Sequence, residues 1–203
     1  MRVRRVVWRV AIVALAAMVS TAPVVAAGQD IVQGPIGLGL IIGGGGTFRG
    51  ELPSNTFYNG LGYNVLAGLV LKPATLPASL RLEGMYNAFF SPLSVYETHV
   101  YSATANGQYN LHLTPFFHPY IIGGVGYYHL DAQEFNPNQA PGNPTEITEP
   151  LNGVGLNGGA GIRSGGPGFG FFAEWRYHYV FAGGKLDPGG HTSFAPFTFG
   201  LVF

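Results

Sequence analysis

The segment Phe169–Phe181 constrains the fold of this chain more than any other stretch. A β-strand sends alternate side chains to opposite faces. Read in this way, one face of the segment is almost entirely aromatic, and the other carries Glu174, Arg176 and His178. Six large rings from one strand are too many for the inside of a small barrel, which holds only a few side chains per layer. The pattern therefore predicts a strand whose rings face lipid and whose charges face a closed interior.

The same alternation recurs along the chain and predicts seven further strands. These are expected at 36–48, 61–71, 80–87, 101–112, 120–130, 154–163 and 197–203. The facing of 120–130 stays open, because both sets of alternate residues contain large and small side chains. No helical pattern appears after the N-terminal segment. We therefore expect an all-β fold, an eight-stranded antiparallel up-and-down transmembrane barrel.

The connections between these segments alternate in length, and the longer ones carry most of the acidic residues. The acids in or beside the longer set are Glu51, Glu97, Asp131, Glu134, Glu146, Glu149 and Asp187. Bacterial outer-membrane barrels have long external loops and short periplasmic turns. The longest connection, 131–150, is rich in Pro, Asn and Glu, and we expect it to be external, mobile and protease-sensitive.

The N-terminal segment has the pattern of a cleavable signal peptide. Four arginines precede a short apolar run, Val10–Val19, and small residues lead to a cleavage site after Ala27. The run is too short to span a membrane comfortably, and Pro23 interrupts it. We therefore expect a signal peptide at 1–27 and a barrel domain at 28–203.

Composition excludes several classes of function. Four of the 10 basic residues lie in the signal peptide, which leaves 6 basic against 10 acidic residues and no basic patch for nucleic acid. The chain has no cysteine, so it can form neither a disulfide framework nor a thiolate metal site. Charged residues make up 10% of the chain, well below the roughly 25% of a soluble domain. We expect no cofactor.

Three segments carry a resemblance to a known family: Pro119–Tyr127, Glu174–Tyr177 and Phe197–Phe203. With these, the chain resembles the small outer-membrane β-barrel superfamily, the eight-stranded barrels similar to the OmpA transmembrane domain and OmpX. The resemblance implies a monomer in the outer membrane of a Gram-negative-type bacterium, surrounded by outer-membrane lipids and lipopolysaccharide. It does not extend to the peptidoglycan-binding domain of longer members, which we do not expect here.

The resemblance also assigns a role to the final strand. A terminal aromatic residue preceded by alternate hydrophobic residues resembles the signal that such proteins present to the outer-membrane assembly machinery. The residues in this register are Phe197, Phe199, Leu201 and Phe203.

Five charged residues share the polar face and form the main candidate site: Arg81, Glu83, Arg163, Glu174 and Arg176. Unpaired charge inside a barrel is costly, so we expect these side chains to pair. The third and seventh strands lie on opposite walls of an eight-stranded barrel, so their long charged side chains are expected to meet near the axis. Three cations against two anions leave one cation in excess, with Asn157, Gln108 or water as its expected partner. An eight-stranded barrel is normally filled by side chains, which favours a structural plug over a gate or a narrow conduit.

Two weaker candidates involve histidine. His99 and His129 are expected near Asp131 at the external ends of neighbouring strands, where they could bind zinc or another divalent ion. We prefer to interpret them as polar residues at the membrane boundary. His191 and Ser193 resemble the His-x-Ser pair of lipid A deacylase barrels. The acid of that family lies downstream, where this chain has none, and Glu174 is the only candidate nearby.

The sequence Gly153-Val-Gly155-Leu-Asn-Gly158 matches a dinucleotide-binding pattern. That interpretation requires a following helix, which is not expected. We interpret these glycines as residues that face a crowded barrel interior.

These observations favour a structural or surface-interaction role without catalysis. Three alternatives remain open: passive transport of small, including hydrophobic, molecules; a lipid A-modifying acyl hydrolase; and a soluble lipocalin-like binding barrel, which would reverse the two faces.

Overall fold

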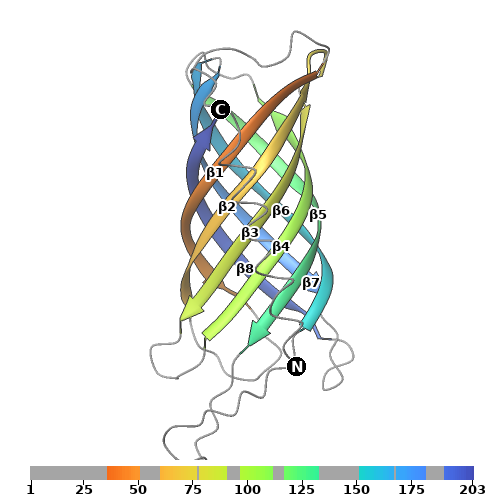
Figure 1. Cartoon of the computed structure of the whole chain (residues 1–203), viewed down its shortest axis with the longest axis vertical. Helices are drawn as coiled ribbons and strands as arrows, with labels where there is room; N and C mark the ends of the chain where they lie inside the picture. The colour runs from red at the N-terminus through yellow and green to blue at the C-terminus, as the bar shows by residue number, and fades with distance from the viewer. Residues whose placement is uncertain are drawn as a thin grey trace, which may run out of the picture.

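The computed structural model describes residues 36–50, 60–76, 78–90, 97–111, 117–132, 151–166, 168–181 and 190–203. They form a closed barrel in which each strand pairs antiparallel with its neighbour in sequence and β8 pairs with β1 (Figure 1). The strands are β1 (Ile36–Arg49), β2 (Leu61–Pro73), β3 (Ala78–Phe90), β4 (Glu97–Asn110), β5 (Phe117–Ala132), β6 (Leu151–Gly166), β7 (Phe169–Phe181) and β8 (Thr192–Val202). The predicted eight-stranded antiparallel barrel is confirmed. The signal peptide expected at 1–27 lies outside the described residues.

Several strands are longer than the alternation predicted. β5 continues to Ala132, inside the predicted loop, because Ala132 still pairs with Thr98 of β4. β8 begins at Thr192 rather than Phe197, because Thr192 pairs with Val180 of β7. Backbone pairing thus extends the strands beyond the regular apolar alternation, since each added pair satisfies polar groups of the main chain.

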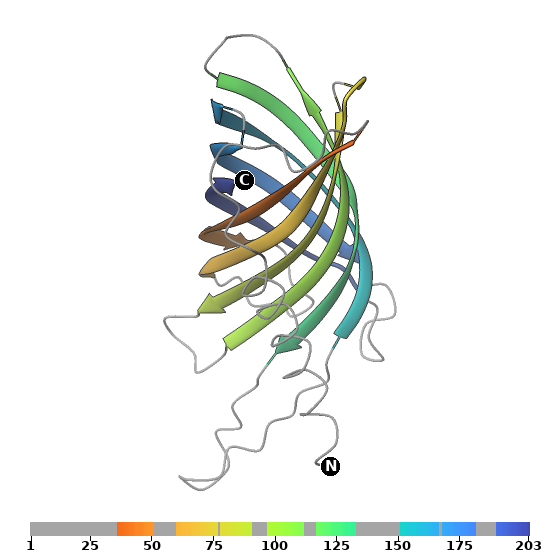
Figure 2. The same ribbon diagram turned by 45° about the horizontal axis from the view of Figure 1, so that its top comes forward.

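The strands cross the barrel at a steep tilt (Figures 1 and 2). Strands β2–β3, β4–β5 and β6–β7 are joined by short connections at one end, here named the short-turn end. The opposite end, from which the β1–β2, β3–β4, β5–β6 and β7–β8 connections leave, is named the long-loop end because it includes the longest of them. The C-terminus lies at the short-turn end, where the backbone N–H of Phe203 donates to the Leu40 carbonyl at 2.9 Å and the Leu40 N–H donates to the Phe203 carbonyl at 3.0 Å. The last residue therefore helps to close the barrel between β1 and β8.

The two faces of the sheet differ as predicted. Trp175 is 49% exposed on the outer face, whereas the adjacent Arg176 is 1% exposed in the interior. Tyr177, Phe197 and Phe199 are likewise exposed. Among the described residues, no helix is long and apolar enough to cross a membrane.

The facing of β5, which the sequence left open, is decided by its neighbours. Tyr120 and Tyr128 are buried inside the barrel, while Ile121 and Val125 are exposed on the outer face. A one-residue shift of register would move every side chain of the strand to the other face. Because Ile122 pairs with Gln108 of β4, and Gln108 faces inward, the even-numbered residues of β5 face inward as well.

Glycine makes room inside the barrel. A Cβ atom added at Gly124 would overlap the carbonyl oxygen of Ala105, and one added at Gly155 would lie 2.9 Å from the Tyr128 ring. The interpretation of the Gly153–Gly158 motif needs one correction, because Gly158 is exposed on the outer face and an added Cβ there would lie 3.9 Å from its nearest neighbour. At the β6–β7 turn, Gly165 and Gly168 have φ values of 132° and 82°, a region that favours glycine.

Candidate functional site: a buried charge cluster in the lumen

Two strands on opposite walls of the barrel supply the centre of the candidate site. Arg81 and Glu83 lie two residues apart on β3, and Glu174 and Arg176 lie two residues apart on β7. Residues two apart on a strand share a face, so each pair points into the lumen. All four residues are buried, at 1–5% exposure. We name these four residues the charge cluster.

Each carboxylate of the charge cluster contacts both guanidinium groups. Arg81 donates from Nε to Glu83 Oε1 at 2.7 Å and from Nη1 to Glu174 Oε2 at 2.7 Å. Arg176 donates from Nη1 to Glu83 Oε2 at 2.6 Å and from Nη2 to Glu83 Oε1 at 2.9 Å. Arg176 Nε also donates to Glu174 Oε1. Two cations and two anions are therefore fully paired across the lumen, as charge burial requires.

Neutral side chains complete the hydrogen bonding around the cluster. Tyr120 donates its hydroxyl to Glu174 Oε2 at 2.8 Å, and Asn106 donates to Glu83 Oε2 at 2.7 Å. The amide oxygen of Gln108 accepts from Arg81 at 3.0 Å. Asn157 in turn donates to Asn106 at 2.8 Å. These residues come from β4, β5 and β6, so the network joins five of the eight strands.

The five charges do not form one network, because Arg163 lies outside it and is the excess cation that the charge count predicts. No ion pair joins Arg163 to any of the described residues, and Gln108, one of the partners expected for the excess cation, contacts Arg81 instead. Arg163 is paired in register with His118 of β5, and its Nε lies 3.5 Å from the position that a Cβ would take on Gly170. Gly170 lies between Phe172 and the β6–β7 turn, so the Arg163 side chain points toward the short-turn end and away from the cluster.

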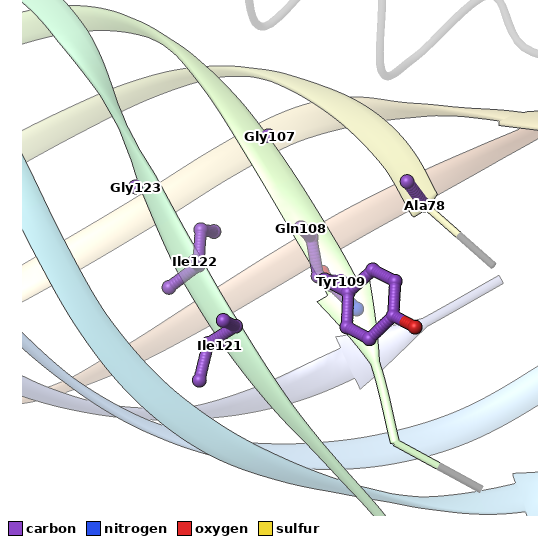
Figure 3. Close-up of a pocket in the computed structure, with 7 residues that line it drawn as sticks. All are labelled: Ala78, Gly107, Gln108, Tyr109, Ile121, Ile122 and Gly123. Carbon is purple, nitrogen blue, oxygen red and sulfur yellow. The ribbon is translucent and has the colours of Figure 1, made fainter.

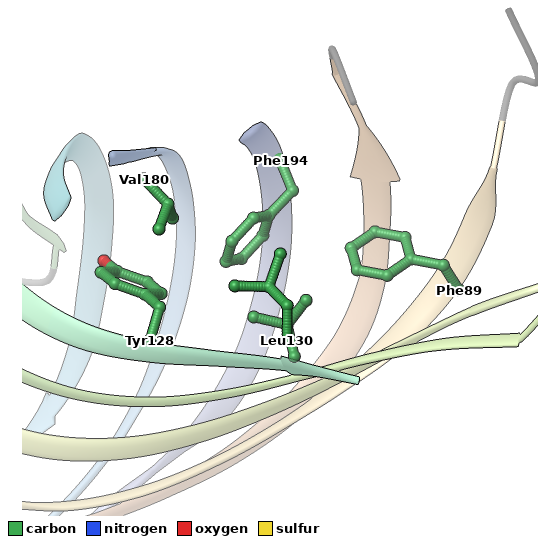
Figure 4. Packing of buried hydrophobic residues seen from close by; sticks show 6 residues of the cluster. Phe89, Tyr128, Leu130, Val180 and Phe194 are labelled. Atoms are coloured by element: carbon green, nitrogen blue, oxygen red, sulfur yellow. The ribbon is translucent and has the colours of Figure 1, made fainter. Parts of the chain in front are cut away.

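Two apolar clusters fill much of the remaining lumen. Toward the long-loop end, Phe89, Val100, Tyr128, Leu130, Val180 and Phe194 pack together (Figure 4). A second cluster contains Ile41, Leu66, Val70, Met85, Phe172 and Val202. The sequence analysis missed these residues as a plug, although each lies in register with the polar inward face and this register could have identified them.

His178 connects the charge cluster with the first apolar cluster. It follows Arg176 by two residues on β7 and is 1% exposed. Tyr128 Oη lies 2.9 Å from His178 Nδ1, and the imidazole stacks on Phe194 with ring centroids 4.6 Å apart. The polar and apolar parts of the plug are thus in direct contact.

The histidine pair proposed for metal binding lies on the outer face at the long-loop end. His99 pairs in register with Asp131, and His129 Nε2 lies 3.1 Å from Asp131 Oδ1. His129 Nδ1 lies 2.7 Å from Asn152 Oδ1, and His99 Nδ1 lies 2.8 Å from Tyr86 Oη. Among the described residues, no group of three or more His, Cys, Asp or Glu side chains is placed to bind a metal. The metal site and the interpretation as boundary residues both stay predictions.

The geometry separates Glu174 from the pair His191 and Ser193. His191 stacks on Tyr179 with ring centroids 5.0 Å apart, and Ser193 pairs in register with the same Tyr179. Glu174 lies five residues earlier on β7 than Tyr179, and its carboxylate is held by Arg81, Arg176 and Tyr120. It is therefore not available as the orienting acid of a triad.

The residues of the expected assembly signal lie along the outer face of β8 and at its end. Phe197 and Phe199 contact each other with ring centroids 4.7 Å apart, and Phe203 contacts Phe169 at 5.6 Å. Phe203 remains 46% exposed. These positions fit an accessible terminal motif, and its role in assembly stays a prediction.

The outer wall also has a shallow hollow of about 400 Å³ between β3, β4 and β5 (Figure 3). Gly107 and Gly123 are register partners in this hollow, and Tyr109 and Ile121 lie beside them. The lining contains no charged side chain. Tyr109 and Gln108 supply the polar side chains of this otherwise apolar lining.

Comparison with solved structures finds similar barrels at low sequence identity. Neisserial surface protein A is 12% identical, with a TM-score of 0.61 over 81% of this chain and 95% of that chain. Ail, the attachment invasion locus protein of Yersinia pestis, is 18% identical, with a TM-score of 0.47 over 82% and 97%. OprG of Pseudomonas aeruginosa is 14% identical, with a TM-score of 0.43 over 81% and 94%. No protein-family model and no curated protein sequence matches the chain.

Proposed function

We propose that this chain, which has the eight-stranded barrel fold of Neisserial surface protein A, is an integral outer-membrane protein with a structural or surface-interaction role. Its barrel anchors the long connections at the cell surface and performs no catalysis.

The distribution of side chains supports the membrane location. The outer face of every strand carries exposed apolar or aromatic residues, including Leu40, Val65, Leu82, Leu156 and Phe171. The charge cluster lies inside. A soluble lipocalin-like barrel would require the reverse, with apolar residues around an internal ligand and polar residues outside. Neisserial surface protein A is, by its name, a surface protein, which is consistent with display of this chain at the cell surface.

One observation favours a plug over a conduit: side chains fill the lumen at two positions along the barrel axis. The charge cluster joins β3 to β7 across the lumen, and the apolar cluster around Tyr128 and Phe194 lies between it and the long-loop end. A continuous water path would have to break paired charges or separate packed rings. We therefore favour a closed barrel over passive transport.

The proposed orientation places the long-loop end outside the cell and the short-turn end in the periplasm. The acidic residues of the long connections support it by analogy with other outer-membrane barrels. In this setting the barrel is a monomer that contacts outer-membrane lipids and lipopolysaccharide. The exposed Phe203 is presented to the assembly machinery.

Conductance of the refolded protein in planar lipid bilayers tests the proposal. We expect no reproducible single-channel steps for the wild type, because both levels of the lumen are closed. The matched variant is Arg176→Gln, which removes one cation from the cluster, and Trp175→Phe on the outer face is the control. Reproducible steps in the wild type that change in Arg176→Gln but not in Trp175→Phe would contradict the closed barrel and support transport.

A further inference from the structure

Arg163 is the charged residue of the lumen that the charge cluster leaves without a counter-ion. Glu83 accepts hydrogen bonds from Arg81, Arg176 and Asn106, and Glu174 accepts from Arg81, Arg176 and Tyr120. Both carboxylates are thus fully engaged. Arg163 is half-buried, and no ion pair joins it to any of the described residues. Its guanidinium is therefore available to an anion that reaches this end of the lumen.

The position of Arg163 fits a partner that enters from the short-turn end. Its side chain passes over Gly170, where a Cβ would lie only 3.5 Å from its Nε. His118 is its register partner on β5 and shares its inward face. Side chains directly opposite on paired strands have Cβ atoms about 5 Å apart. A guanidinium and an imidazole are therefore placed side by side at this mouth of the barrel.

Among the described residues at the short-turn end, no Asp or Glu side chain competes for Arg163. The terminal carboxylate of Phe203 lies at the same end but at the seam between β1 and β8, whereas Arg163 lies on β6. The three short connections, 74–77, 111–116 and 167–168, contain neither Asp nor Glu. Lys72, near the end of β2, adds an exposed positive charge at the same end. A charge held between low-dielectric walls attracts counter-ions more strongly than one in open water. The half-buried guanidinium of Arg163 is therefore placed to attract an anion.

We propose that Arg163 and His118 form a binding site for a phosphate group at the short-turn mouth of the lumen. Arginine presents a planar fork of N–H donors that matches phosphate oxygens, and charge-assisted hydrogen bonds of this kind are stronger than neutral ones. Donors from two neighbouring strands approach from different directions, which suits a tetrahedral oxyanion better than a planar carboxylate. The site is independent of the surface role proposed above and does not depend on an open lumen.

The test is a titration of the refolded protein with inorganic phosphate in maltoside micelles, which contain no phosphate headgroups. The arginine Nε–H signals are followed by NMR at constant ionic strength, and the Arg163 signal is the one missing from Arg163→Gln. We expect this signal to shift saturably with phosphate and to shift less with acetate. An Arg163 signal that does not move, or that moves equally with chloride, overturns the proposal.

Variants distinguish a specific phosphate-binding site from a general electrostatic attraction of anions to this end of the barrel. Binding measured by calorimetry should weaken about tenfold or more in Arg163→Gln, as expected for the loss of a charge-assisted hydrogen bond. Lys72→Gln removes an exposed charge at the same end and should weaken binding much less than Arg163→Gln, because Lys72 is outside the proposed site. Arg163→Lys keeps the charge and should bind phosphate more weakly than the wild type but more tightly than Arg163→Gln. Equal binding by Arg163→Gln and the wild type would contradict the site.

A last comparison distinguishes the source of the phosphate. If phosphatidylglycerol nanodiscs shift the Arg163 signal without added phosphate, the group comes from a lipid headgroup. If only inorganic phosphate shifts it, the ligand is a soluble phosphate. Either result supports the site, and a signal that responds to neither contradicts it.

Discussion

Replacing Glu174 by glutamine should destabilise the barrel by about 3–5 kcal/mol, the range for removing one partner of a buried ion pair. Glu174 accepts hydrogen bonds from Arg81 at 2.7 Å, from Tyr120 at 2.8 Å and from Arg176 Nε. After the substitution, two guanidinium groups share the single charge of Glu83. Glutamine keeps the shape of the side chain, so the loss reports the charge rather than a cavity.

The double variant Glu174→Gln, Arg176→Gln should recover part of this loss. It leaves Arg81 and Glu83, one cation and one anion, which contact each other directly in the wild type. The variant removes two neighbouring residues, so a double-mutant cycle gives their coupling energy. Asp131→Asn is the matched control, because its pairing with His129 lies at the exposed outer face. Its effect should be about 0–1 kcal/mol.

Urea unfolding in lipid vesicles, followed by the fluorescence of Trp175, compares the wild type, Glu174→Gln, Arg176→Gln, the double variant and Asp131→Asn under one condition. The reasoning fails if Glu174→Gln and the double variant both unfold at the urea concentration of the wild type. In that case the charges would be solvated, and the lumen would be a wet conduit rather than a plug. A double variant that is less stable than Glu174→Gln would refute the pairing between the two removed residues.

Four further predictions concern other parts of the chain. Gly124→Ala should destabilise the barrel by about 1–3 kcal/mol through overpacking, while Gly107→Ala on the outer face, with its nearest atom at 3.9 Å, should be neutral or stabilising by about 0.5–1 kcal/mol; urea unfolding of both variants checks this. A spin label at Trp175 should be accessible to oxygen in the bilayer and one at Arg176 should not, and the reverse result would invert the barrel. Deleting Phe203 should reduce insertion in cells more than it reduces the stability of refolded barrels, and unchanged insertion would remove its role as an assembly signal. Protease added to whole cells should cleave within 133–150, and cleavage only after permeabilisation of the outer membrane would reverse the orientation.

The architecture could be predicted from the sequence because alternation with a period of two is local information. In β7 the aromatic and charged sets differ so strongly that only one facing is physically acceptable, and Trp175 and Arg176 lie as predicted. Strand ends were less predictable. Thr192 and Ala132 belong to strands because neighbouring strands continue past them, which the residues themselves do not indicate.

The sequence by itself determined that Arg81, Glu83, Arg163, Glu174 and Arg176 share the inner face, since facing depends only on position along a strand. The strand count also indicated that the charges of β3 and β7 can meet from opposite walls, but the tertiary structure decided which atoms pair and that Arg163 stays apart. The tilt and closure of the barrel bring Glu83 of β3 to Arg176 of β7, while Arg163 lies nearer the short-turn end and points away from them. The facing of β5 was also settled only by pairing, because its alternate residues differ too little in polarity for either face to be preferred. Local periodicity determines whether a side chain faces the lumen or the lipid. The position of that side chain along the barrel axis depends on the pairing register of every strand around the barrel, and no single segment contains that information.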